Sequence, residues 1–320
     1  MSETSPGRAC PLHYRTRPED LAGGPDLHAE TAYVIGGLYG NPAALEAIKA
    51  LAAVEVAQGL PRPRRIFNGD FHWFDAESEL FAGIQKRVLA HTAMQGNVEA
   101  ELADPDPGAG CGCAYPEWVD DNMVARSNRI MESVQQLIGR QPSLSEQLGR
   151  LPRQLRLEIA GHRIGVVHGD PDSIAGWGLA VEQMPPPGTS DETLENWFRA
   201  AEVDAIACTH TCLPFIQDCQ AGGRRRVVIN NGSAGMPNFR DDPRGLISRI
   251  SRHPAPFETC YRTRLGSLYL EAVPLEVVTR EWRQGFERMW PPGSPAYESY
   301  WSRLMEGPDF TRARAVRLAE

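Results

Sequence analysis

Phe67-Asn68-Gly69-Asp70 is the segment from which our interpretation of this 320-residue chain starts, because Asp70 follows a predicted strand at residues 64–68. A single aspartate in such a place is usually a turn residue or a helix cap. Four other segments place further polar residues after predicted strands or short apolar runs: Val34-Ile35-Gly36-Gly37-Leu38-Tyr39-Gly40-Asn41, Gln95-Gly96-Asn97-Val98-Glu99, Val166-Val167-His168-Gly169-Asp170 and Thr209-His210-Thr211-Cys212-Leu213-Pro214-Phe215. Each segment alone occurs by chance, so the specific signal lies in their order and spacing.

Together the five segments resemble the calcineurin-like metallophosphoesterase superfamily. Its signature is Asp-x-His-Gly-Asn, Gly-Asp, Gly-Asn-x-(Asp/Glu), His-Gly and Gly-His-x-His-x-Pro-Phe, each at the end of a strand. The resemblance runs from about residue 31 to residue 243, and residues 229–237 resemble a segment of the YfcE-like bacterial phosphodiesterase branch. It implies an α/β fold, namely a four-layer sandwich of two mixed β-sheets flanked by helices.

The resemblance also implies which residues hold metal. In the family the Gly-Asp carboxylate bridges two ions. The residues expected around one of these ions are all present here: Asp70, Asn97, His168 and His210. The other ion would have Gly37, Tyr39 and Cys212 where the family has Asp, His and His. The losses fall on one ion only, so we predict a site with one divalent transition metal ion.

The identity of that ion follows only in part from the ligand types. Carboxylate, amide and imidazole groups form a mixed oxygen and nitrogen set that suits Mn, Fe, Co, Ni or Zn. A second ion is less expected, but a rebuilt second site stays open as an alternative. Tyr39 and Cys212 can both bind metal when deprotonated, and His72 lies beside Asp70. Trp73 stands where the purple acid phosphatase branch has a metal-binding Tyr, and an indole offers a cation no lone pair.

The expected chemistry is hydrolysis of a phosphate ester by a metal-activated water, with the metal ligands Asp70, Asn97, His168 and His210 as the catalytic set. We assign substrate contacts to four further residues near the motifs or on the helical insert: His72, Arg126, Asn230 and Ser233. Val98 occupies the position at which many family members carry a His that protonates the leaving group. We therefore expect weak activity on poor leaving groups.

Two functions are compatible with these residues. The first is a metal-dependent phosphoesterase, more specifically a phosphodiesterase, that acts on a small phosphorylated substrate. The alternative is a non-catalytic metal- or phosphate-binding pseudo-enzyme of the same fold. Both require the metal ligands, so the ligand pattern alone does not separate them.

Composition limits the partners and the compartment. With 33 Lys and Arg against 41 Asp and Glu, the net charge is −8, so no overall basic field indicates nucleic acid. We find no apolar run of membrane-spanning length and no secretory leader pattern. Seven cysteines, an odd number without a disulfide-framework spacing, fit a reducing compartment. We therefore expect a cytoplasmic protein, for which an oligomer is possible.

The chain divides into three predicted parts. Residues 1–30 mix Pro, Gly and charge and form an N-terminal arm or a partly disordered lead-in. Residues 31–282 form the metallophosphoesterase domain, with a helical cap insert at about 100–150, and residues 283–320 form a tail that packs on the domain. Helices are predicted at 43–58 and 118–140, and strands at 64–68, 90–95, 155–160, 163–168, 204–208, 226–230 and 265–279.

Overall fold

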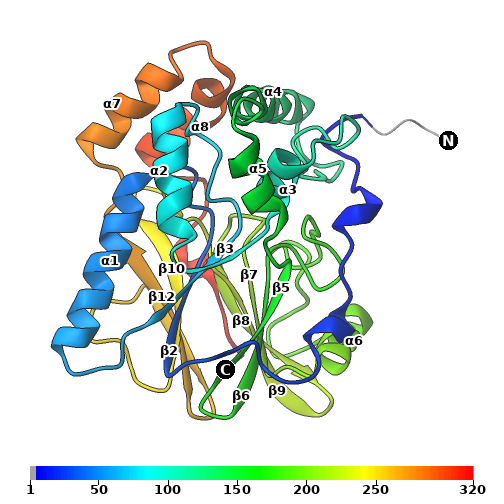
Figure 1. The fold of residues 1–320 in the computed structure, drawn as a ribbon. Coiled ribbons are helices and arrows are strands. Elements are labelled where there is room, and N and C mark those ends of the chain that lie inside the picture. Colours follow the sequence, from blue (N-terminus) through cyan, green and yellow to red (C-terminus); the bar gives the residue numbers. More distant parts are fainter. Residues whose placement is uncertain (1–4, 320) are drawn as a thin grey trace.

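The computed structural model describes residues 5–319, whose strands form two stacked mixed sheets with helices on their outer faces (Figure 1). The predicted α/β fold of two mixed sheets flanked by helices is thereby confirmed. The parallel strands of both sheets end at the same side of the molecule. That edge is where ligand sites form in α/β sheets, because the loops that leave the strands meet there.

The six-stranded sheet contains the strands that lead to the first three motifs. Its order is β11-β12-β10-β2-β3-β4, in which β2, β3 and β4 are parallel and the other pairs are antiparallel. The strands are β2 (Thr31–Ile35), β3 (Arg64–Asn68), β4 (Thr92–Met94), β10 (Gly245–Ser251), β11 (Tyr261–Leu265) and β12 (Leu268–Leu275). Every residue of β2 is buried, as expected for a strand covered on both faces.

The seven-stranded sheet contains the strands that lead to the last two motifs. Its order is β1-β5-β6-β7-β9-β8-β13, with β6, β7 and β9 parallel at its centre. The strands are β1 (Leu27–His28), β5 (Gln154–Ile159), β6 (His162–Val167), β7 (Ala205–Cys208), β8 (Phe215–Ala221), β9 (Arg224–Asn230) and β13 (Val316–Arg317). Apolar side chains of both sheets, among them Val34, Ile66, Val166 and Ile229, form one core between them.

Helices cover the two outer faces and one end of the sandwich (Figure 1). A second core joins the six-stranded sheet to helices from the first half and the end of the chain. The helices are α1 (Pro42–Ala57), α2 (Ser78–Val88), α3 (Asn97–Ala103), α4 (Asp121–Ile138), α5 (Pro142–Gly149), α6 (Glu192–Ala201), α7 (Arg280–Met289), α8 (Pro295–Glu306) and α9 (Arg312–Ala315). Asn41 caps α1, accepting a hydrogen bond from the Ala43 amide at 2.9 Å.

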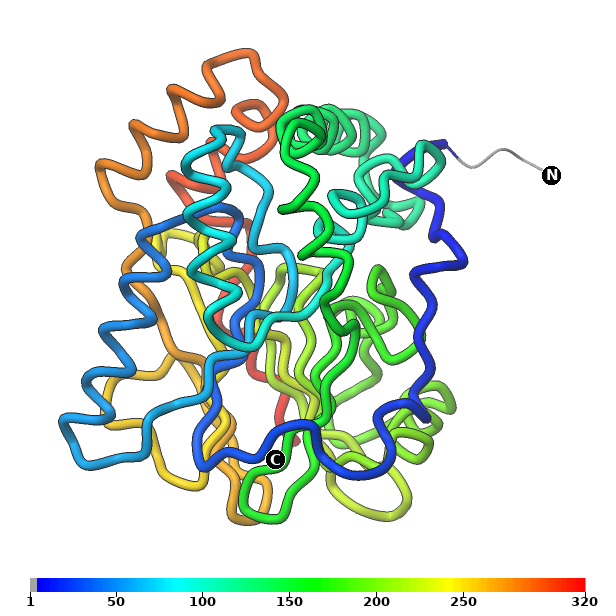
Figure 2. The backbone as a smooth tube through the Cα atoms, in the orientation of Figure 1, coloured from blue at the N-terminus to red at the C-terminus, as the bar shows by residue number. Residues whose placement is uncertain are grey.

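The N-terminal arm lies against the domain over the residues that the structure describes. It contains two short 3₁₀ helices (Leu12–Tyr14 and Pro18–Leu21) and adds β1 to the seven-stranded sheet, parallel to β5. Tyr14 and Leu21 are buried, and Figure 2 traces the arm along the side of the molecule before it enters β2. Isolated apolar residues that hold such an arm have no periodic pattern, so this packing could not be predicted from the sequence.

Several predicted boundaries differ from the structure. The strands predicted at 155–160 and 163–168 are β5 and β6, which end and begin one residue earlier than predicted because the hairpin turns at Ala160 and Gly161, both with positive φ (51° and 77°). The predicted strand 265–279 is instead the second half of the β11–β12 hairpin, and β8 and β10 were not predicted. No helix among the described residues is long and apolar enough to cross a membrane. The division at residues 30 and 282 remains a prediction.

Candidate metal centre

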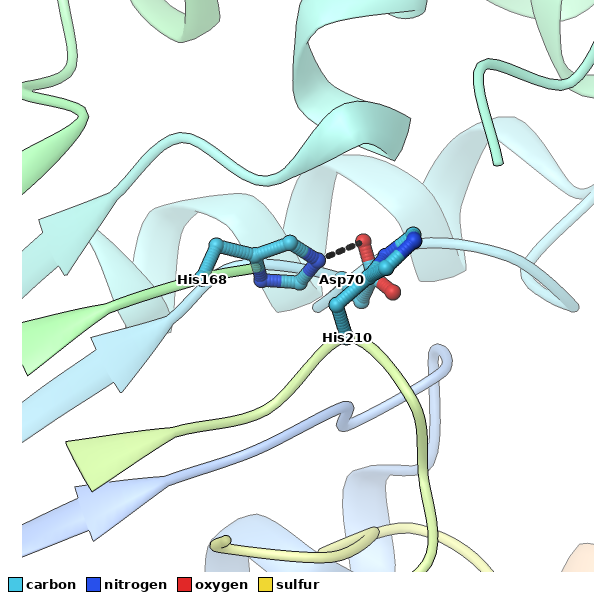
Figure 3. A group of neighbouring side chains, drawn as sticks. All are labelled: Asp70, His168 and His210. Atoms are coloured by element: carbon cyan, nitrogen blue, oxygen red, sulfur yellow. Dashed lines mark ion pairs between the residues drawn. The ribbon is translucent and has the colours of Figure 1, made fainter. Parts of the chain in front are cut away.

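Four polar side chains from four separate segments meet at the edge where the parallel strands end. Asp70 follows β3, Asn97 opens α3 after β4, His168 follows β6 and His210 follows β7. Figure 3 shows Asp70, His168 and His210 turned toward one another. One potential ligand atom from each of these three residues lies within 4.8 Å of the others. The structure thus brings together all four residues that the sequence assigned to metal.

The distances place the Asn97 amide oxygen at the centre of this group. Asn97 Oδ1 lies 3.2 Å from His168 Nε2 and 3.0 Å from His210 Nδ1. Asp70 Oδ1 lies 3.3 Å from the same His168 Nε2, yet it is buried and receives no well-aligned hydrogen bond within residues 5–319. All four residues are less than 8% exposed. A buried carboxylate oxygen in this state needs a cation or a proton to offset its desolvation.

Outer hydrogen bonds fix which nitrogen of each imidazole faces the group. His168 Nδ1 lies 2.6 Å from the Asn68 carbonyl oxygen, and His210 Nε2 lies 3.1 Å from the Cys113 carbonyl oxygen. A carbonyl only accepts, so these nitrogens carry the protons. In the neutral rings, His168 Nε2 and His210 Nδ1 then present lone pairs toward the lone pairs of Asn97 and Asp70. This arrangement of ring nitrogens is typical of metal-binding histidines.

The pKa values of the three charged groups depend on one another. Burial raises the pKa of Asp70, but the neighbouring His168 and His210 outweigh burial and hold it below its usual range. Burial lowers the pKa of His168, but Asp70 outweighs it and raises the value. Burial and the neighbouring His168 lower the pKa of His210 to about 4. His210 is therefore neutral at physiological pH, as a metal ligand must be.

Glu99 holds the two ligand loops of the six-stranded sheet together. Its carboxylate accepts hydrogen bonds from the amides of Asp70 (2.8 Å), Phe71 (3.0 Å) and Gly96 (3.0 Å). The loop after β3 and the start of α3 are thus joined by one buried side chain. Gly69 adopts a positive φ of 77° in this loop, and a Cβ there would lie 2.4 Å from His168 Nδ1. Only glycine fits that position.

The region beside Asp70 that would hold a second metal in the family contains packed side chains instead. Tyr39 Oη lies 2.7 Å from Cys212 Sγ. A Cβ added to Gly37 would lie 2.2 Å from Cζ of Tyr39, so the phenol ring fills the space next to this glycine. Burial is the main cause that raises the pKa of both Tyr39 and Cys212. Both groups are therefore protonated near neutral pH and are poor ligands in that state.

The metal-ligand group lies at the floor of a cavity of about 210 Å³. Aromatic and apolar side chains dominate its wall: Tyr39, Trp73, Val98, Tyr115, Met123, Trp177, Met236 and Tyr300. Polar residues complete it: Asp70, Asn97, Cys113, His210, Thr211, Cys212, Ser299 and Arg303. The cavity can therefore hold a small molecule that has one polar end at the ligand group and an apolar remainder.

The four residues predicted to contact substrate do not line this cavity. His72 is fully buried, lies 2.6 Å from Asp75 through Nδ1, and stacks on Phe81 with ring centroids 3.6 Å apart. Its Nε2 is buried and has no hydrogen-bond partner within residues 5–319, so its role toward substrate or a second metal ion stays a prediction. The chain leaves β3 at Asn68, before His72, so the alternation of that strand does not set the direction of the imidazole.

The other three predicted residues support the surroundings of the cavity. Arg126 donates from Nε to Ser299 Oγ at 2.6 Å and so links α4 to α8. Asn230 is buried and donates to Thr211 Oγ1 at 3.0 Å, while its own Oδ1 accepts from the Gly232 amide. Ser233 is buried and pairs through its backbone with Gly37. None of the three is among the residues that line the cavity, and their contact with substrate stays a prediction.

Sequence analysis missed residues that reach the cavity from distant segments. Trp177 lies in the loop after β6 and packs edge-on against His210 at 5.4 Å between ring centroids. Tyr300 and Arg303 come from α8, which lies beyond the region of family resemblance. The aromatic residues near 297–301 signalled that this helix packs back on the domain. No sequence pattern indicated that it contributes to the cavity.

Comparison with known proteins supports the fold and nothing finer. No protein-family model matches the sequence, and no curated protein matches it. Among solved structures, a hypothetical protein from Pyrococcus horikoshii is 16% identical with a TM-score of 0.59, covering 88% of this chain and 100% of that one. A metallophosphoesterase from Sphaerobacter thermophilus is 18% identical with a TM-score of 0.51, covering 87% of this chain and 100% of that one. The chain therefore has the metallophosphoesterase fold.

Proposed function

We propose that this chain is a metal-dependent phosphoesterase, acting on a phosphodiester, with a site reduced to one metal ion. The observation that carries the proposal is the convergence of Asp70, Asn97, His168 and His210, whose potential ligand atoms turn inward and leave Asp70 Oδ1 without a well-aligned hydrogen bond within residues 5–319. This donor set fits a borderline divalent ion such as Mn, Fe, Co, Ni or Zn. A bound ion would supply a water of lowered pKa and would polarise a phosphoryl oxygen.

The residues of the chain prepare the site for that chemistry. The carbonyl oxygens of Asn68 and Cys113 hold the two imidazoles in the required orientation. Glu99 fixes the loop that carries Asp70. The aromatic wall excludes water from the substrate side, which strengthens electrostatic interactions inside the cavity. These supports favour a working site over an accidental cluster of polar residues.

The shape and lining of the cavity support an ester with a flat apolar group. Trp177, Tyr115 and Tyr300 line it together with two methionines. Aromatic side chains bind rings through offset or edge-on contacts, worth about 0.5–1.5 kcal/mol beyond burial. An aryl ester that places its phosphoryl group at Asp70 and His210 fits this wall.

A second function, that of a non-catalytic binding module, is favoured by one specific observation. Val98 lines the cavity at the position where a leaving-group acid is expected, and the other residue next to Asn97 is Gly96. Proton transfer to a leaving group is typically worth ~10²–10⁴-fold in rate. Without this acid, the site would bind phosphate and metal while turning over only esters whose leaving group needs no proton.

Hydrolysis of an activated diester separates the two functions. Bis(4-nitrophenyl) phosphate carries a good leaving group, and we expect metal-loaded protein to cleave it slowly, with alkyl phosphates hardly cleaved. Asp70→Asn should remove both the metal and the activity. If the metal-loaded protein hydrolyses no activated mono- or diester faster than Asp70→Asn between about pH 6 and 9, where a metal-bound water titrates, the enzyme proposal fails and the binding module is the better account.

A further inference from the structure

The cavity wall contains one arginine, Arg303 of α8, among the residues that line it. This side chain is half-buried, and it reaches the cavity from the C-terminal helix. Its Nη2 donates to the carbonyl oxygens of Cys212 and Pro237, each at 3.3 Å, and its Nε donates to Pro237 O at 3.3 Å. These neutral acceptors hold the guanidinium in place without neutralising its charge.

No carboxylate forms an ion pair with Arg303 within residues 5–319, whereas 14 other arginines of the described residues do form one. Its Nη1 also makes no hydrogen bond among the described residues. A half-buried guanidinium that lines a cavity and has no acidic partner can bind an anionic ligand in that cavity. The two N–H groups of Nη1 are therefore the donors of Arg303 that remain for a phosphoryl oxygen, because Nε and Nη2 already donate to carbonyl oxygens.

The position of Arg303 is on the side of the cavity that lacks metal ligands. It contacts Cys212, which in turn contacts Tyr39. Burial raises the pKa of Cys212, and the positive charge of Arg303 is the next largest influence and opposes that rise. The guanidinium therefore lies close to the region where Tyr39 and Cys212 are packed together.

A second hydrogen-bond donor of the wall also lacks an acceptor. Trp73 is 3% exposed and lines the cavity, and its Nε1 finds no hydrogen-bond partner within residues 5–319. A buried indole N–H usually has a partner. The indole N–H is a hydrogen-bond donor and not an acceptor, so it cannot bind a cation but can donate to an anionic oxygen.

We propose that Arg303, together with the Trp73 N–H of the same cavity wall, binds the phosphoryl oxygens of the substrate and takes the electrostatic role that a second metal ion would have. This inference rests on the proposed function, because it assigns a residue to the same site. In a two-metal site the second cation stabilises charge on the oxygens of the phosphoryl group. A fixed guanidinium stabilises the same charge without needing carboxylate or imidazole ligands. The substrate class is thus an anionic phosphoryl ester whose charge lies between one metal and one arginine.

Three variants test this assignment on the full-length, metal-loaded protein. Arg303→Gln removes the charge, Arg303→Lys keeps the charge without the guanidinium, and Trp73→Phe removes the indole N–H together with the pyrrole ring that carries it. Arg288→Gln is the matched control, because Arg288 is 68% exposed on α7 and pairs with Glu77. For each protein we would measure metal content, kcat and KM for bis(4-nitrophenyl) phosphate, and the Kd for inorganic phosphate by calorimetry.

We expect Arg303→Gln to keep its metal and to lose about 100-fold or more in kcat/KM, the usual cost of one transition-state charge donor. Phosphate affinity should fall with it, and added guanidinium should restore part of the rate. Arg303→Lys should keep more activity than Arg303→Gln, and Trp73→Phe should lose less than either Arg303 variant. The Arg288→Gln control should behave as wild type.

Two results would overturn the inference. The first is an Arg303→Gln protein with wild-type kcat/KM and phosphate affinity. The second is an Arg303→Gln protein whose lost activity is not restored by added guanidinium, together with an Arg303→Lys protein that is equally inactive. That result would show a merely structural role. If wild-type protein holds metal but hydrolyses nothing, the proposed function fails, and phosphate binding still decides the role of Arg303. Absence of phosphate binding in the wild type would refute it.

Discussion

The two sides of the cavity floor lie at the same strand ends but differ in chemistry. One side has inward-facing ligand atoms, and the other has two side chains that hydrogen-bond to each other. On one side Asp70, Asn97, His168 and His210 turn lone pairs toward a common point, and Asp70 Oδ1 has no hydrogen-bond partner within the described residues. On the other side the Tyr39 hydroxyl and the Cys212 thiol satisfy each other at 2.7 Å. Buried polar atoms that have no hydrogen-bond partner indicate a ligand site. Two buried groups that hydrogen-bond to each other need no ligand.

The backbone conformation is similar on the two sides of the cavity floor, although their side chains differ. Asp70 (φ 54°), Tyr39 (φ 52°) and Cys212 (φ 59°) all adopt the left-handed region, which costs non-glycine residues energy. The strained loop shape therefore exists on both sides, including the side without ligands. The comparison teaches that loop geometry belongs to the fold, while the presence of a metal depends on a few side chains that single substitutions can remove.

The largest expected effect comes from removing one ligand on the intact side. His210→Ala or His168→Ala leaves three of four ligands, and we expect loss of the bound metal and of all diester hydrolysis. Elemental analysis of protein purified without added metal, followed by activity assays, would measure both. His91→Gln is the control, since the His91 side chain is exposed and does not line the cavity. Two tightly held ions per wild-type chain would contradict the one-metal interpretation.

Restoring a ligand on the packed side tests the comparison from the other direction. Gly37→Asp alone should destabilise the protein by roughly 3–5 kcal/mol, because its Cβ would overlap the Tyr39 ring and its carboxylate would be buried unpaired. Combining it with Tyr39→His and Cys212→His removes the ring and supplies a full ligand set. We expect the metal count to rise from one to two and stability to recover when metal is added.

The control for that experiment is the double variant Tyr39→His with Cys212→His, which keeps Gly37. It should bind one ion, because the carboxylate is missing. If the triple variant also binds one ion, the packed side lacks more than its three ligands. Chemical denaturation with and without metal would show which of these outcomes holds.

The sequence predicts the position of a side chain best where that side chain directly follows a strand. The ordered motifs indicated that Asp70, Asn97, His168 and His210 would meet, since the carboxyl ends of parallel strands lie at one edge. They also indicated that Gly37, Tyr39 and Cys212 would lie together beside Asp70. These inferences need only the order of motifs and the fold, and both are local or family-level information. The metal-binding role itself stays a prediction.

Other features depend on contacts that no local pattern encodes. Arg303 and Tyr300 reach the cavity because α8 packs against α4, more than 150 residues away in sequence. The direction of the His72 side chain could not be predicted from strand alternation, because the chain leaves β3 at Asn68. β8 and β10 were missed because polar residues such as Gln217 and Arg249 are buried in them, which breaks the apolar pattern of a buried strand.

Glu101, a buried residue that supports the metal-ligand side of the cavity floor, should make the free energy of unfolding depend on pH. Glu101 accepts hydrogen bonds from the Tyr14 hydroxyl and, at 2.9 Å, from the Asp106 amide, so it joins the arm to the loop that carries Cys113. Burial raises the pKa of Glu101 to about 7. The folded state therefore holds a proton that the unfolded state releases near pH 4.5. Stability is highest below that pH and falls as pH rises through 7, by up to about 3 kcal/mol.

Glu101→Gln should flatten this decline, as measured by urea denaturation of metal-free protein at pH 5 and pH 7.5. Some slope should remain, because burial also raises the pKa of Asp170, to about 6, with the same sign. Glu192→Gln, at an exposed position of α6, is the control and should keep the wild-type slope. An unchanged slope in Glu101→Gln would show that Glu101 is ionised in the folded protein at neutral pH.

The smallest expected effect concerns the packed side alone. Tyr39→Phe removes the hydroxyl that contacts Cys212 Sγ, and the loss of one buried hydrogen bond should cost about 0.5–1.5 kcal/mol of unfolding free energy. Metal content should not change. The pH slope between 5 and 7.5 should not change either, because burial raises the pKa of both Tyr39 and Cys212 and keeps them protonated throughout. Tyr297→Phe is the control, since its hydroxyl makes no hydrogen bond within residues 5–319. A Tyr39→Phe protein that loses a metal ion would show that the phenol is a ligand, and the two sides of the cavity floor would then share one chemistry.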